Sequence, residues 1–170
     1  MPELELTRAP GDKKLYVLEG VGSLRLRGWF SRSASAETAV GDRSWELAQR
    51  GVFHTVIEAY DAAGTPVGAY EPRAFRRGGN LMWHDHGYGL RPASAWKERY
   101  ALTFGGDREL AIIEGKGWSK RPVKVAVPDP SALPPGLLLF TVYVVRSLAE
   151  NAQTAATAGA TAATTVAATG

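Results

Sequence analysis

The sequence contains no cysteine among its 170 residues. Disulfide bonds and thiolate metal sites are therefore excluded, and the absence of cysteine fits a reducing compartment. The first five residues, MPELE, are acidic and contain no apolar stretch of the kind that forms a secretory signal. Together these absences predict a cytoplasmic protein.

A strong charge imbalance and a long hydrophobic run are also missing. Lys and Arg number 20 against 17 Asp and Glu, and the resulting formal charge of +3 is too small to indicate a nucleic-acid partner. The most apolar run, LLLFTVYVV at 137–145, is much shorter than the roughly 20 apolar residues that a membrane-spanning helix needs. We therefore expect no nucleic-acid partner and no transmembrane span.

Signatures of catalysis are missing as well. There is no Gly-x-Ser-x-Gly sequence for a nucleophilic serine, and the glycine-rich stretch at 20–23 precedes a predicted strand rather than a helix. His84 and His86 form a candidate metal pair, because side chains two residues apart on a strand point the same way. The alternative is a polar connection between two strands, and no third histidine or cysteine lies nearby. The sequence thus predicts no catalytic residue, no metal site and no cofactor.

The apolar run at 137–145 must be buried. Its seven Leu, Phe and Val side chains contribute on the order of 14 kcal/mol on burial, at about 2 kcal/mol each. The apolar residues cover every face, and the pattern continues helically through Leu148 and Ala149. We therefore interpret residues 136–150 as a buried helix.

Ten to twelve short strand patterns, separated by turn signals, precede this helix. The LRLR sequence at 24–27 alternates in the way that a half-buried strand does, and glycine-rich turns such as 105–107 are typical of hairpins. Residues 31–36, SRSASA, are small and polar and fit either a loop or an edge strand. Strands at this spacing indicate an antiparallel sandwich or barrel. A helix that is apolar on all sides fits a barrel better, since a helix capping a sheet keeps a polar face.

Residues 151–170 form a low-complexity segment of Ala, Thr and Gly without charge or aromatic residues. Alanine favours helix, but the threonines and glycines weaken it, and little apolar surface is available for packing. We expect one folded domain over residues 1–150 and a mostly disordered tail at 151–170, beyond a frayed helix end.

A characteristic order of turns and aromatic residues runs through roughly residues 5–150. It consists of Trp45, YDAAG at 60–64 with VGAY at 67–70, GGNLMW at 78–83, YGL at 88–90, a loop with Trp118, and the terminal apolar helix. This order resembles the superfamily of tubby C-terminal, phospholipid-scramblase and LURP-one-related domains, and is most similar to its small bacterial members. The resemblance implies a mainly β fold: a closed antiparallel barrel of about twelve strands with the hydrophobic C-terminal helix through its centre. The calcium segment of scramblases is missing here, since Glu150 is the only acid after Val145.

Two basic loops are the candidate binding sites. The residues singled out in them are Arg73, Arg76 and Arg77 in the first loop and Lys116, Lys120 and Arg121 in the second. An ordinary solvated surface is the alternative. Trp118 beside Lys116 and Lys120 suits a membrane interface, where an aromatic ring lies among cations. The two loops can act together only if they open at the same end of the barrel, and the sequence alone leaves this open.

The expected function is a non-enzymatic binding or scaffold domain. Membrane association in the superfamily and the two basic loops suggest an anionic phospholipid or phosphate ligand and a location peripheral to the membrane. The alternative is a protein–protein interaction module with no small ligand. An enzyme is less consistent with the predicted fold, because the helix fills the space where a ligand cavity would otherwise lie.

Overall fold

The computed structural model describes residues 2–28, 32–51, 55–74, 77–94, 96, 98–115 and 122–168, with the part of the last helix after Ala152 described as backbone only. The strands are β1 (Glu3–Arg8), β2 (Leu15–Leu18), β3 (Gly22–Arg27), β4 (Ser33–Thr38), β5 (Ser44–Arg50), β6 (Val56–Asp61), β7 (Pro66–Pro72), β8 (Gly79–Trp83), β9 (His86–Ser94), β10 (Arg99–Phe104), β11 (Arg108–Glu114) and β12 (Val123–Ala126). A short 3-10 helix, η2 (Pro130–Ala132), and the helix α1 (Pro135–Ala168) follow.

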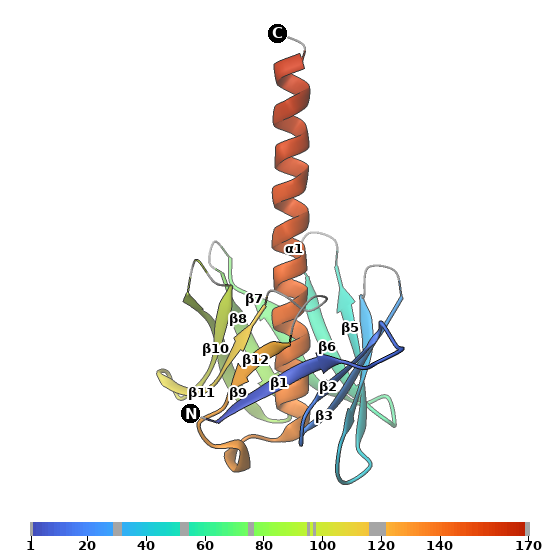
Figure 1. The fold of residues 1–170 in the computed structure, drawn as a ribbon. Coiled ribbons are helices and arrows are strands. Elements are labelled where there is room, and N and C mark those ends of the chain that lie inside the picture. Colours follow the sequence, from blue (N-terminus) through green and yellow to red (C-terminus); the bar gives the residue numbers. More distant parts are fainter. Residues whose placement is uncertain are drawn as a thin grey trace.

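The twelve strands form one closed antiparallel barrel (Figure 1). Each strand pairs with the next in the sequence, and β1 closes the barrel by pairing with β12 in a register that places Leu4 opposite Val125. Closure leaves no open sheet edge, so every strand has two hydrogen-bonded neighbours. The fold class expected from the sequence, a twelve-stranded closed barrel with a C-terminal helix, is confirmed.

The alternation of apolar and polar residues along the strands gives the barrel wall an apolar inner face and a polar outer face. In β3, Leu24 and Leu26 are buried inside while Arg25 and Arg27 face solvent. The same two-residue period recurs in β8, where Leu81 and Trp83 are buried and Met82 is outside. The period of two directs one face of each strand to the barrel interior and the other to water.

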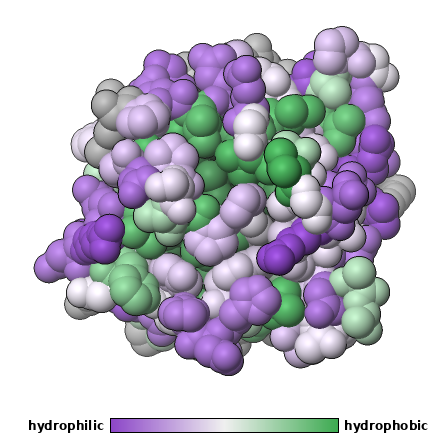
Figure 2. Space-filling model, turned by 90° about the horizontal axis from the view of Figure 1, so that it is seen from below, coloured by the Kyte–Doolittle hydropathy of each residue, from purple (hydrophilic) through white to green (hydrophobic). Residues whose placement is uncertain are grey.

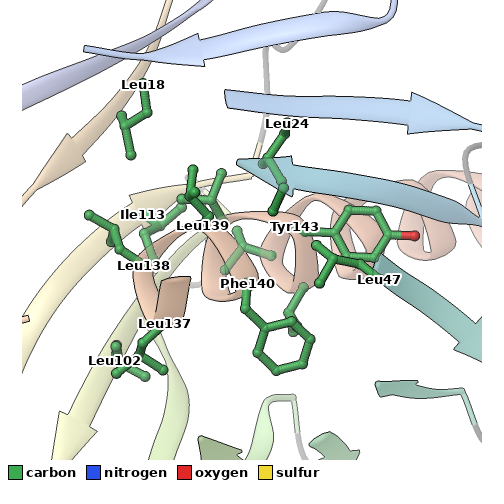
Figure 3. Close-up of a cluster of buried hydrophobic side chains, with 14 of the residues drawn as sticks. Leu18, Leu24, Leu47, Leu102, Ile113, Leu137, Leu138, Leu139, Phe140 and Tyr143 are labelled. Carbon is green, nitrogen blue, oxygen red and sulfur yellow. The ribbon is translucent and has the colours of Figure 1, made fainter. Parts of the chain in front are cut away.

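Helix α1 fills the interior of the barrel (Figures 1 and 3). No side chain from 137 to 145 is more than 3% exposed, and Leu137, Leu139 and Phe140 lie among strand residues that include Leu24 and Leu102. This confirms that the apolar run is a helix buried on every side. A helix in a closed sheet meets apolar side chains all round, so it needs no polar face over this length.

The helix begins next to two tryptophans. The rings of Trp45 and Trp83 meet edge to face, with centroids 5.6 Å apart, and Trp83 also packs 5.7 Å from Phe140. Gly136 passes between them so closely that a β-carbon there would lie 2.6 Å from Trp83 and 2.7 Å from Trp45. Figure 2 views this end of the molecule and shows apolar residues at its centre, surrounded by hydrophilic ones.

The helix continues well past position 150 and ends at Ala168. It therefore includes most of the segment for which a disordered tail was expected from the sequence. Alanine has the strongest helix propensity, and an existing helix extends without the cost of nucleation, so the threonines and the glycine do not end it. In Figure 1 this part of α1 projects from the barrel along its axis.

Candidate functional site at the mouth of the barrel

The order of the strands fixes two ends of the barrel. Because consecutive strands are antiparallel neighbours, the connections between them alternate strictly between the ends. We call the end where α1 begins the base, with connections 19–21, 39–43, 62–65, 84–85, 105–107 and 127–134. The end where α1 leaves the barrel is the mouth, with connections 9–14, 28–32, 51–55, 73–78, 95–98 and 115–122.

The two ends carry opposite charge. Among the described residues, the mouth connections contain five basic and two acidic side chains, namely Lys13, Lys14, Arg32, Arg73 and Arg77 against Asp12 and Glu98. The described base connections contain five acidic residues and one basic residue, namely Glu19, Asp42, Asp85, Asp107 and Asp129 against Arg43. A nearly neutral chain thus has a basic mouth and an acidic base, which orients it in the field of a charged partner.

The structure describes two of the six candidate site residues, Arg73 and Arg77, and both belong to one mouth connection. Arg76, Lys116, Lys120 and Arg121 lie outside the described residues. The strand ends that flank the second basic loop, Glu114 of β11 and Val123 of β12, also lie at the mouth. The described strand ends on either side of the two basic loops therefore all lie at the same end of the barrel.

The described ends of the 73–78 connection lie close together. The Arg73 amide donates to the carbonyl of Gly78 at 3.1 Å, and the Arg73 guanidinium donates to Asn80 Oδ1 at 3.1 Å. Gly78 has φ +92°, in the left-handed region that favours glycine. These contacts hold Arg73 against the start of β8, and Arg77 at the other side of the connection is exposed.

A cavity of about 160 Å³ opens beside Arg77, between the emerging helix and the barrel wall. Its lining residues include Tyr70, Arg77, Gly78, Glu98, Tyr100 and Leu148. Tyr70 comes from β7 and Tyr100 from β10, both with side chains turned inward, while Leu148 of α1 forms the inner wall. The cavity is therefore built by segments that are distant in the sequence.

The two phenols of the cavity are buried. Tyr70 is 0% exposed, and its hydroxyl has no hydrogen-bond partner among the described residues. Burial raises the pKa of Tyr70 well above its usual range. Burial also raises the pKa of Tyr100, an effect that the nearby Arg77 opposes and Glu98 reinforces. Both phenols stay protonated at neutral pH and can donate hydrogen bonds.

Glu98 occupies an unusual backbone conformation at the edge of the cavity. Its φ is +47°, which is uncommon for a residue other than glycine. Its carbonyl accepts a hydrogen bond of 2.8 Å from the amide of Gly115, which ties the connection before β10 to the end of β11. Glu98 lines the same small cavity as Arg77.

Polar contacts fix the helix where it leaves the barrel. Arg146 forms an ion pair of 2.7 Å with Glu150 and lies over the ring of Tyr16, 5.8 Å from its centroid. Gln49 of β5 donates to Ser147 Oγ at 2.7 Å. Burial raises the pKa of the Glu150 carboxyl group, which Arg146 opposes. These contacts set the rotation of α1 at the mouth and so place Leu148 in the cavity wall.

Trp96 is a mouth residue that the sequence interpretation missed. It precedes β10, which starts at Arg99, and its side chain is 92% exposed. A large apolar ring that is almost fully exposed suits an interface with lipid or protein. Its neighbours Lys97 and Glu98, both charged, were the available signal that it stands outside the apolar alternation.

The geometric basis of the histidine pair was wrong. His84 lies in the turn between β8 and β9 with φ +50°, whereas His86 begins β9 and pairs with Trp83, so the two do not share a strand. The His84 amide donates to the carbonyl of Val67 at 2.6 Å, as expected for a polar connection. Within the described ranges, no three His, Cys, Asp or Glu residues are grouped closely enough to hold a metal ion.

Comparisons of the chain with protein-family models, curated proteins and solved structures found no match. In the part of the chain that the structure describes, no helix has the length and apolarity needed to cross a bilayer. The function is therefore inferred from the charge, exposure and geometry of the mouth.

Proposed function

We propose that the protein is a non-enzymatic binding domain that docks on anionic phospholipid surfaces through the mouth of its barrel. The opposite charge of the two ends is the observation that carries this proposal. An anionic surface attracts the basic mouth and repels the acidic base, so it selects one orientation of the molecule.

Trp96 supports a membrane as the partner. Its exposed ring lies at the same end as Arg73 and Arg77. Tryptophan prefers the boundary between water and lipid, where its ring meets apolar chains and its N–H stays hydrated. Five further Lys and Arg residues belong to the mouth connections in the sequence, outside the described residues: Arg76, Lys97, Lys116, Lys120 and Arg121.

Family membership and location are part of the same proposal. A closed barrel threaded by a C-terminal helix is the architecture that a resemblance to the tubby-like superfamily implies, and it supports placing the chain there. A protein at the cytoplasmic surface of a membrane is consistent with the absence of cysteine and with an exposed basic face.

Reversing the charge of the mouth is expected to abolish binding to anionic vesicles. Each basic residue near an anionic surface contributes about 1 kcal/mol, so losing two weakens binding roughly thirtyfold before the repulsion of the new acids is counted. The test measures co-sedimentation with phosphatidylserine vesicles at low and physiological salt. It compares the wild type with a double variant that carries both Arg73→Glu and Arg77→Glu. Wild-type binding should weaken as salt rises, because the Debye length falls from about 30 Å at 0.01 M to about 8 Å at 0.15 M.

The matched control is the double variant Arg43→Glu with Arg108→Glu. Both residues are exposed at the base, and the variant changes the net charge by the same amount. It should bind vesicles as well as the wild type does. Equal loss in both double variants would show attraction without orientation, and absence of wild-type binding at low salt would leave a protein partner as the better explanation.

A further inference from the structure

One of the residues that line the cavity beside α1 has a polar group whose hydrogen-bonding capacity is unused. Tyr70 is fully buried, and its hydroxyl has no hydrogen-bond partner among the described residues. Leaving such a group unpaired costs about 1–3 kcal/mol, so buried hydroxyls ordinarily have a partner. The cavity that Tyr70 lines measures about 160 Å³, whereas one water needs roughly 10–15 Å³ by a comparable measure. The space is therefore large enough for a small ligand.

The size of the cavity limits what it can hold. Pockets for whole cofactors and drug-sized ligands usually measure about 300–1,000 Å³. A cavity of about 160 Å³ beside the mouth fits a headgroup-sized molecule. Its opening lies at the end of the barrel that carries the basic residues, so an anionic group is drawn toward it.

The lining residues select the chemistry of that group. Tyr70 and Tyr100 supply two hydroxyl donors and Arg77 supplies a guanidinium, a donor set that suits phosphate oxygens. Glu98 lines the same cavity and disfavours a ligand that carries only negative charge. A ligand that satisfies all four residues carries a cationic amine close to its phosphate.

We propose that this cavity binds an aminoalkyl phosphate, with its phosphate at Tyr70, Tyr100 and Arg77 and its ammonium group at Glu98. Such a group occurs free, as O-phosphoethanolamine, and as the headgroup of phosphatidylethanolamine and phosphatidylserine. The headgroup case rests on the docking function proposed above and gives the mouth a preference for particular lipids. Leu148 and Ala152 of α1 line the cavity, so a bound headgroup contacts the emerging helix directly.

Calorimetric titration of the full chain with soluble probes tests the cavity apart from the membrane. The wild type should bind O-phosphoethanolamine at least tenfold more tightly than inorganic phosphate. Tyr70→Phe removes one donor to the phosphate and should weaken O-phosphoethanolamine about tenfold, without lowering the melting temperature, because the lost hydroxyl has no protein partner. Glu98→Gln should bring the affinities for the two probes together.

Tyr88→Phe is the control for the loss of a phenol. Tyr88 is partly buried on β9, where it packs against Phe104 at the other end of the barrel, and its substitution should leave both affinities unchanged. Absence of O-phosphoethanolamine binding, or equal affinity of the wild type and Tyr70→Phe, would overturn the proposal and leave a cavity that holds only water.

Vesicles separate this proposal from the docking function. Phosphatidylglycerol vesicles lack the amine, and wild-type binding to phosphatidylserine vesicles of equal charge should exceed binding to them. That excess should disappear in Tyr70→Phe. Equal binding to both lipids without soluble-probe binding would overturn the cavity proposal alone, whereas soluble-probe binding without vesicle binding would overturn membrane docking and leave the cavity as a site for the free ligand.

Discussion

Replacing Phe140 with Asp is expected to prevent the chain from folding. Phe140 is 0% exposed, and its ring lies 5.7 Å from that of Trp83 near the axis of the barrel. The substitution places an unpaired carboxyl group among apolar side chains and leaves a cavity where the ring was. The combined cost is about 5 kcal/mol or more, which is comparable to the entire net stability of many domains, at about 5–15 kcal/mol.

Asn151→Asp is the matched control, because it adds a carboxyl group to the same helix at an exposed position just outside the barrel. Soluble yield and thermal melting followed by circular dichroism distinguish the two variants. The control should melt within a few degrees of the wild type. If the Phe140→Asp protein did the same, the helix would not be the core of the barrel.

Gly78→Ala is expected to give the second largest loss of stability. Gly78 has φ +92°, and a β-carbon there would lie 2.2 Å from the carbonyl oxygen of Leu90. A left-handed conformation costs an alanine about 1–2 kcal/mol, and the clash with backbone atoms adds about 1–3 kcal/mol, since neither strand can move independently in a closed barrel. The connection that carries Arg73 and Arg77 and one wall of the cavity would be displaced as well.

Gly64→Ala separates the cost of the left-handed backbone conformation from the cost of the steric clash. Gly64 has φ +81° in a base connection, but a β-carbon there would meet no atom within 4 Å. It should therefore show the backbone cost alone, and thermal melting should place Gly78→Ala roughly 5–10 °C below it. Equal melting temperatures for the two variants would show that β9 yields easily at Leu90.

The barrel and its helix were predictable because their signals are local. The alternation of Leu24 and Leu26 with Arg25 and Arg27 marks a strand directly, and the apolar run at 137–145 marks a segment that water cannot surround. Residues 31–36 were ambiguous because their interior side chains are small. Ala34 and Ala36 of β4 are fully buried against α1, and their size reflects the close approach of the helix, which the sequence does not state.

The candidate site was less accessible to sequence interpretation because it depends on distant segments. Tyr70 and Tyr100 read as ordinary inward residues of strands, and only the position of Leu148 on the emerging helix leaves a cavity between them. The strand ends that flank the two basic loops share an end of the barrel because four strands, β8 to β11, lie between the loops. From the sequence the number of strands was known only as ten to twelve, so it could not be decided whether the two loops lie at the same end.

The docking face can be located directly, since the chain has no native cysteine and one introduced thiol carries one fluorophore. Ala74→Cys places an environment-sensitive label such as nitrobenzoxadiazole between Arg73 and Arg77 at the mouth, and Val40→Cys places it at the base, where the native side chain is 85% exposed. On addition of phosphatidylserine vesicles at low salt, the label at position 74 should shift to shorter wavelength and be quenched by nitroxide-bearing lipids, while the label at position 40 should not change. A response at position 40, or none at position 74 while the protein co-sediments with the vesicles, would contradict the assignment of the mouth as the membrane-docking end.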